Sequence, residues 1–364
     1  MVFIKRLIWL LVAFLFFLVF QVDLFGQDTT VRTIHGTVTD SADNQTIQNV
    51  HVYLSNTTDG TVTDAGGHYI LKTELTGHFT LVFSHVGYDT KSVEIRLGEE
   101  TEIEATTELH TVVYDLNGVA IIAEADDEWE RNLDLFTKEF IGTSFIAQDA
   151  EILNPWIIEF GINGNGQLEA NASEPLLIEH HALGYHIHVD LISFRWDPDE
   201  GTGHYTFFHR FTEMESDSWR QRRSWRYQRR LAFRGSFEHF LHSLYHDQLS
   251  QDKFMTAVQD SFKTTEIELL NQYELDEYLA DREIKYSSHP GLKGFRIREN
   301  VDIIFLRSYA RSVIRERSRL VPQNPSNIFL VTEHGRLFHP LSLRIDGVWS
   351  QHRIGDLLPV GFTL

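Results

Sequence analysis

Short segments that alternate between apolar and polar residues fill the region from residue 32 to about residue 123, and they constrain the fold more than any other feature. Alternation with a period of two is the pattern of a half-buried strand. Glycine, aspartate and asparagine separate the segments, as is typical of turns in a small β-sandwich. The predicted strands cover residues 33–40, 49–55, 68–75, 78–88 and 91–97.

Residues 56–71, with the sequence NTTDGTVTDAGGHYIL, interrupt this alternation and raise the question of a binding loop. Gly60, Gly66 and Gly67 permit a positive φ, and Asp59 and Asp64 can hydrogen-bond within their own turns. A calcium loop requires several carboxylates at closely alternating positions, whereas threonines dilute the two aspartates here. The pattern therefore favours a turn over a cation-binding or sugar-binding loop.

Three stretches of this region, GTVTDSADNQTIQNVHVYL, GTVTDAGGHYIL and HFTLVFSHVGYDTKSVEI, carry a family pattern. The matching positions are Gly36, residues 49–52, residues 60–67, and Gly87 with Tyr88. Residues 31–110 thus resemble a carboxypeptidase-regulatory-like domain of the Bacteroidetes type. The resemblance implies a transthyretin-like β-sandwich, usually a non-catalytic accessory that often precedes outer-membrane transporters. Residues 112–124 resemble the strand that commonly follows it.

The motifs of a peptidase are absent from the sequence. None of the nineteen histidines has a glutamate three residues later, as the zinc pair of a metallocarboxypeptidase would require. The sequence also contains no H-E-x-x-H, no G-x-S-x-G and no P-loop. Too few residues follow the sandwich to build a large transporter barrel.

The N-terminus indicates an exported protein, and the composition excludes several classes of partner and site. Lys5 and Arg6 precede an apolar run at residues 7–20, the pattern of a signal peptide covering residues 1–26. The alternative is an uncleaved signal that anchors the chain in the inner membrane. A formal net charge of -20 disfavours nucleic acid as a partner. The lack of cysteine excludes disulfides, cysteine zinc sites, iron–sulfur clusters and a lipid-bearing cysteine.

Residues 124–364 read as a second domain, of the α+β class, after the carboxypeptidase-regulatory-like β-sandwich at residues 27–123. We expect a helix near residues 133–145, a hairpin at 156–170, and a helical region at 216–249 broken at Gly235 and capped by Ser236. Strands are predicted at 174–194, 204–211, 301–309, 326–338 and 340–345, and a short terminal helix at 350–359.

Four stretches of this half, FIGTSFIAQDAEILNP, LGYHI, RGSFEHFLHSLYHDQL and GVWSQHRIGDLLP, also carry a resemblance. They are similar to a C-terminal region of unknown function in exported Bacteroidetes proteins that contain the regulatory-like module. The similarity covers most of residues 130–360. The similarity implies a two-domain architecture and export from the cytoplasm, and it points to no particular activity.

A candidate metal site lies in the segment HIHVD. On a strand, His186, His188 and Asp190 project from one face, and two imidazoles with a carboxylate can hold zinc or iron. Glu179, His180 and His181 are nearby in sequence. The alternative is the polar face of a half-solvated sheet.

Arginines with interspersed tryptophans form a second candidate site. Arginine forks suit carboxylates and phosphates, and indoles can stack on sugars or receive cations. The alternative is a helix that pairs with the acidic surface of the protein itself. The run contains Arg220, Arg222, Arg223, Arg226, Arg229, Arg230 and Arg234, and the residues expected to bind ligand are Trp219, Arg222, Arg223, Trp225, Arg226 and Arg230.

Three further tryptophans, Trp156, Trp196 and Trp349, could form a carbohydrate platform or lie partly in the core. Taken together, these patterns favour a non-enzymatic binding or scaffolding component of the cell envelope, in the periplasm or at the outer membrane. Its expected partners are an envelope protein, a glycan or an anionic lipid; no catalytic residue and no cofactor is predicted. The alternative is a metal-dependent hydrolase built on the second domain. We expect the sandwich to support or dock.

Overall fold

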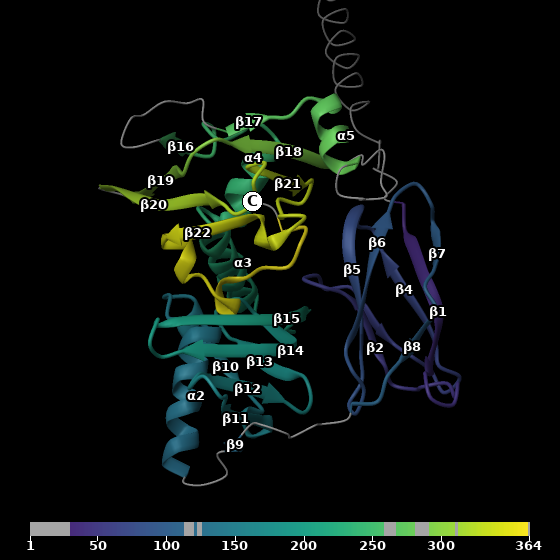
Figure 1. The fold of residues 1–364 in the computed structure, drawn as a ribbon. Coiled ribbons are helices and arrows are strands. Elements are labelled where there is room, and N and C mark those ends of the chain that lie inside the picture. The colour runs from purple at the N-terminus through teal and green to yellow at the C-terminus, as the bar shows by residue number, and fades with distance from the viewer. Residues whose placement is uncertain are drawn as a thin grey trace, which may run out of the picture.

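The computed structural model describes residues 30–112, 120–121, 126–257, 267–280, 291–309 and 312–362. The predicted signal peptide therefore lies outside the described residues. Figure 1 shows a β-sandwich standing beside a larger C-terminal part, with β2 and β5 on the side of the sandwich that faces it. Strands dominate and a few helices pack between or against the sheets, which confirms the predicted α+β class.

The sandwich consists of two four-stranded sheets. One contains β4 (His68–Thr73), β1 (Arg32–Asp40), β7 (Glu102–Glu104) and β8 (Thr107–Leu109). The other contains β3 (Gly60–Val62), β2 (His51–Leu54), β5 (Gly77–Ser84) and β6 (Lys91–Leu97). Strand β4 alternates strictly between exposed and buried residues, and Ile34, Val52 and Phe83 are fully buried between the sheets. The predicted strands are confirmed here.

A seven-stranded sheet forms the first layer of the C-terminal part. It contains β9 (Ala120–Ile121), β10 (Ala150–Ile152), β11 (Ile158–Ile162), β12 (Leu168–Ala172), β13 (Leu176–His180), β14 (Tyr185–Asp197) and β15 (Thr202–Glu213). The long β14 is central, because β13 pairs with its first half, β12 with its second half, and β15 with its other edge. Helix α2 (Asp126–Phe140) packs on this sheet through Phe136 and Phe140. The helix thus begins before the predicted span at 133–145 and ends within it.

Two smaller sheets complete the C-terminal part. One contains β16 (Phe254–Ala257), β19 (Val301–Tyr309), β20 (Ser312–Pro322) and β22 (Leu343–Gly347). The other contains β17 (Ile267–Leu269), β18 (Leu292–Ile297) and β21 (Ile328–Thr332). Helix α5 (Gln272–Ala280) packs its buried Leu275 and Leu279 on this sheet. Among the described residues, no helix combines the length and apolarity needed to cross a membrane.

Helices α3 (Trp219–Phe233) and α4 (Phe237–Tyr245) connect these layers. The predicted break between them is confirmed: Gly235 has a φ of 83°, and the Ser236 hydroxyl accepts a hydrogen bond from the His239 N–H. Of two late predictions, one is confirmed only in part and one is wrong. The strand expected at 326–338 ends at Thr332, because a turn follows, and the helix expected at 350–359 is replaced by short 3₁₀ turns. The described residues contain the 3₁₀ turns η1 (Ala147–Asp149), η2 (Pro155–Ile157), η3 (Pro340–Ser342), η4 (Val348–Gln351) and η5 (Ile354–Asp356).

The beginning of the stretch 56–71 joins the sandwich to the C-terminal part. Asn56 adopts a φ of 68°, and its N–H donates to the carbonyl of His209 on β15 at 2.7 Å. The Asn56 carbonyl accepts from the Val360 N–H, and the Thr57 carbonyl accepts from the Phe211 N–H, both at 2.8 Å. The stretch thus consists of turns on either side of the short strand β3, followed by the start of β4. The backbone groups of Asn56 and Thr57 are hydrogen-bonded across the interface between the two parts.

Candidate functional site

Helix α3 carries the predicted arginines, and its inner face fixes it to the protein. The helix begins after Ser218, whose hydroxyl accepts from the Gln221 N–H. Trp225, Arg229 and Phe233, spaced four residues apart, are its buried side chains. That spacing places them on one side of a helix. Most of the remaining positions of α3 are exposed.

Trp225 and Arg229 make the contacts that hold the helix. Trp225 Nε1 donates to the carbonyl of His181 at 2.9 Å, and its ring lies directly against Gly184. The Arg229 guanidinium lies 3.9 Å from the centre of the Tyr185 ring, and its Nη1 donates to Glu213 at 2.7 Å. Trp225, predicted to bind ligand, is only 6% exposed and instead anchors the helix from behind.

The outward side of α3 presents a row that we call the arginine face: Trp219, Arg223, Arg226, Tyr227 and Arg230. All five side chains are exposed, Trp219 by 59% and Tyr227 by 60%. No salt bridge links these three arginines to a carboxylate of the described residues. Because like charges three and four residues apart repel each other on a helix, the row stabilises neither the helix nor a neighbour by itself.

The other predicted arginines are distributed around this face. Arg220 lies over the Trp219 ring, with 5.6 Å between its guanidinium carbon and the ring centre. Arg222 is exposed and donates to the carbonyl of Ser216. Arg234 is exposed beyond the end of the helix. The alternative of pairing with the acidic surface of the protein holds for the buried Arg229, and the exposed arginines of the face have no such partner among the described residues.

The predicted metal residues are divided between different partners. His186 lies 3.7 Å from Glu179, which also contacts His181 at 3.2 Å. Burial, together with the nearby charge of Arg210, lowers the pKa of His188 to about 4. The part of the chain that the structure describes contains no group of three or more His, Cys, Asp or Glu side chains that could hold a metal ion.

Asp190 belongs to the interface with the sandwich. Its carboxylate is 7% exposed and accepts hydrogen bonds from the Tyr53 hydroxyl of β2 and the Ser84 hydroxyl of β5. Burial raises the pKa of Asp190, although both hydroxyls act in the opposite direction. The sandwich therefore covers the Asp190 end of the polar face of the HIHVD strand. Neither of the two hypotheses from the sequence, a metal site or a solvated sheet face, predicts this contact.

The three tryptophans considered as a carbohydrate platform do not share a surface. Trp156 is 73% exposed, whereas Trp349 is 6% exposed and donates from Nε1 to the carbonyl of Gly235 in the core. Trp196 packs partly buried against the core of the seven-stranded sheet. The residues that join the two parts, such as Tyr53 and Ser84, carry no sequence signal, because their partner lies more than one hundred residues away.

Comparison with known proteins identifies the sandwich. Residues 34–121 match the family model described as CarboxypepD_reg-like domain, which confirms the resemblance of this part to a carboxypeptidase-regulatory-like domain. A search of curated proteins gives no match.

Solved structures are similar to parts of the chain at low identity. They include BcpA, the major pilin subunit of Bacillus cereus (15% identity, 23% of this chain and 31% of that chain, TM-score 0.20). A type II cohesin–X-dockerin complex of Acetivibrio cellulolyticus matches at 18% identity, over 31% of this chain and 76% of that chain, with a TM-score of 0.20. A putative membrane-associated protein of unknown function from Bacteroides fragilis matches at 8% identity, over 51% of this chain and 84% of that chain, with a TM-score of 0.19. The chain thus spans about a third of the pilin.

Proposed function

We propose that this protein is a non-enzymatic binding component of the bacterial cell envelope and that the arginine face of α3 binds an anionic glycan. The observation that carries the proposal is the row of exposed Arg223, Arg226 and Arg230 in a chain of net charge -20, unpaired with any described carboxylate. A protein with many acidic residues offers ready partners for surface arginines, so an unpaired row suits a partner from outside. No observation on the described residues favours the alternative of a metal-dependent hydrolase.

The chemistry of the face suits an acidic sugar chain. Guanidinium groups donate in pairs to carboxylates and sulfates, and Trp219 and Tyr227 offer flat apolar surfaces on which sugar rings stack. The face is also rigid, because Trp225 and Arg229 fix the helix from behind. A preorganised row loses less conformational entropy on binding than a flexible one.

In this proposal the sandwich supports the binding part. Its turn at Asn56 and its hydroxyls at Tyr53 and Ser84 are hydrogen-bonded to the C-terminal part. Such contacts hold the two parts in one orientation. This agrees with the accessory role that the family resemblance implies.

Export to the envelope is the second element of the proposal. It rests on Lys5, Arg6 and the apolar run that follows them. N-terminal sequencing of the protein from envelope fractions should show cleavage near Gly26. A chain beginning at Met1 in the cytoplasm would refute export, and an intact chain in the inner membrane would support the anchor alternative.

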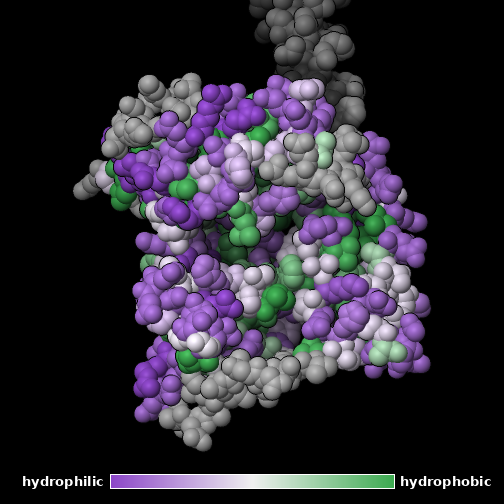
Figure 2. Space-filling view, viewed as in Figure 1, coloured by the Kyte–Doolittle hydropathy of each residue, from purple (hydrophilic) through white to green (hydrophobic). Residues whose placement is uncertain are grey.

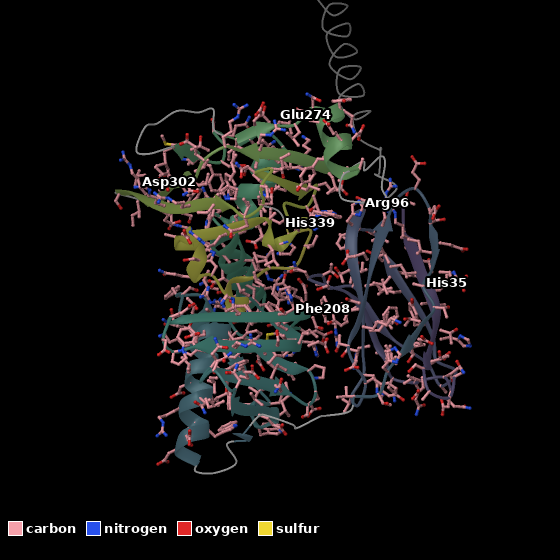
Figure 3. All side chains as sticks on the ribbon, viewed as in Figure 1. His35, Arg96, Phe208, Glu274, Asp302 and His339 are labelled. Atoms are coloured by element: carbon pink, nitrogen blue, oxygen red, sulfur yellow. The ribbon has the colours of Figure 1, made fainter. Side chains whose placement is uncertain are left out.

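Charge reversal tests the arginine face. We expect the double variant Arg223→Glu/Arg226→Glu to bind polygalacturonate about tenfold or more weakly than the wild type, since several ion pairs are lost together. The matched control is Lys72→Glu/Arg96→Glu, which changes the net charge equally on exposed strands of the sandwich; Arg96 is labelled in Figure 3. Wild-type binding should weaken as salt rises, because exposed charges are screened.

The outcomes separate the possibilities. Circular dichroism and thermal melts establish whether the double variant folds, and an unfolded variant would show that the arginines are structural. A folded variant that binds polygalacturonate as the wild type does would refute the site. Binding of the wild type to phosphatidylglycerol vesicles and not to polygalacturonate would refute the glycan and favour an anionic lipid.

A further inference from the structure

A cavity of about 590 Å³ opens between the sandwich and the C-terminal part. Figure 2 shows this hollow, with apolar residues on its walls. Pockets for small molecules in proteins usually measure about 300–1,000 Å³. The cavity is separate from the arginine face, because no residue of that face lines it.

Nine of the nineteen residues that line the cavity are aromatic or aliphatic, and they come from several elements. Phe79 comes from β5 of the sandwich, Phe208 from β15, and Phe237 from α4. Phe208 is labelled in Figure 3, between β15 and the sandwich. The remaining apolar lining residues are Leu241, Leu337, Phe338, Pro340, Ile345 and Val360. Such walls favour a ligand with an apolar body.

Arg336 is the cation on this wall. Its Nη2 donates to Asn56 Oδ1 at 3.2 Å and to the carbonyl of Leu358 at 3.0 Å, and its Nη1 contacts Glu238 at 3.4 Å. The side chain is 23% exposed, so it is held in place and still reaches the cavity. Burial lowers the pKa of Arg336, and the nearby Glu238 carboxylate opposes this shift.

The two carboxylates on the wall already have partners. Glu94 accepts from the Thr80 hydroxyl at 2.8 Å and is exposed. Glu238 makes a single contact of 3.4 Å with Arg336 rather than a two-pronged pair. The guanidinium of Arg336 has five N–H donors. Glu238 accepts from one of them, and Asn56 Oδ1 and the Leu358 carbonyl accept from two more. Arg336 therefore retains donors for an acidic group in a cavity whose wall is about half apolar.

We propose that this cavity binds a small amphipathic carboxylate, with its aromatic or aliphatic body against the phenylalanines and its acidic head on Arg336. A charge-assisted hydrogen bond in a partly dry site is stronger than one in water, which gives the head its selectivity. The site requires both parts of the chain, because β5 and Asn56 belong to the sandwich and Arg336 to the C-terminal part. The proposal is independent of binding at the arginine face.

Calorimetry with two matched probes, 4-phenylbutyrate and 4-phenyl-1-butanol, tests the proposal on the full protein. They share a body and differ in the head. We expect the acid to bind the wild type more tightly than the alcohol. Ile345→Trp, which narrows the cavity with a larger side chain, should weaken binding of both. Val313→Trp adds the same side chain to an exposed position on β20 and should leave binding unchanged.

Arg336→Gln tests the contact between Arg336 and the acidic head group of the ligand. It should weaken binding of the acid by about tenfold or more and leave binding of the alcohol within about twofold. If this variant fails to fold, Ile345→Trp still decides whether the cavity is the site. Wild-type protein that binds neither probe, or an Ile345→Trp variant that folds and binds both unchanged, would overturn the proposal. Equal loss of both probes in a folded Arg336→Gln variant would overturn the role of Arg336.

Discussion

His209 should make the stability of the protein depend on pH in a defined window, and replacing it by phenylalanine should remove that dependence. The side chain is 5% exposed on β15, between the rings of Phe207 and Phe211, each centred 5.2 Å away. Its Nε2 has no hydrogen-bond partner among the described residues. Burial, with the nearby charge of Arg336, lowers the pKa of His209 to about 3.

The sign and size of the effect follow from the two pKa values. The folded chain keeps His209 neutral down to pH values near 3, whereas the unfolded chain binds a proton near its ordinary pKa of 6.5. Stability from this group is therefore fully present above pH 6.5 and is lost as the pH falls toward 3. Since one pH unit corresponds to about 1.4 kcal/mol, lowering the pH from 7 to 5 should remove about 2 kcal/mol.

The assay compares wild type and His209→Phe by urea unfolding at pH 7 and pH 5, at equal ionic strength. All other titrating groups are common to both proteins, so the change in their difference reports on His209. Between pH 7 and pH 5, the free energy of unfolding of the variant should rise by about 2 kcal/mol relative to that of the wild type. A His204→Phe variant, at an exposed position of the same strand, controls for the loss of a histidine.

A constant difference between wild type and His209→Phe at the two pH values would refute the reasoning. It would mean that His209 binds a proton in the folded protein as readily as in the unfolded chain. Any packing effect of the larger ring appears equally at both pH values, so it does not mimic the predicted change.

Two further substitutions test the packing around the interface and α3. Asp190→Ala should lower the free energy of unfolding by about 3 kcal/mol, because Tyr53 and Ser84 lose their buried acceptor. Tyr53→Phe should lower it by only about 1 kcal/mol. Equal losses for the two variants in urea unfolding would contradict this prediction. Gly184→Ala should destabilise by about 3 kcal/mol, since its φ is 68° and a Cβ would lie 2.2 Å from the Trp225 ring; a melting temperature unchanged from the wild type would show that the ring does not pack there.

Local sequence patterns determined much of the secondary structure. The period-two alternation of β4 and the glycine–serine break between α3 and α4 depend on backbone geometry within a few residues, so they can be predicted without knowing the fold. The spacing of Arg223, Arg226 and Arg230 likewise places them on one side of any helix. The predictions failed near the end of the chain. There, β21 stops at Thr332 within the strand predicted at 326–338, and short 3₁₀ turns replace the helix predicted at 350–359.

Tertiary structure decided which of the predicted site residues are available. A helical period shows that Trp225 and Arg223 lie on different sides of α3, and only packing against Gly184 shows which side is covered. The alternation of β14 groups His186, His188 and Asp190, and the sandwich then takes Asp190 into the interface through hydroxyls from β2 and β5. The cavity beside Arg336 has no counterpart in any local pattern, because its walls come from segments that meet only when the two parts pack. Periodicity records the faces of an element, whereas burial of one face against another depends on contacts between residues far apart in the chain.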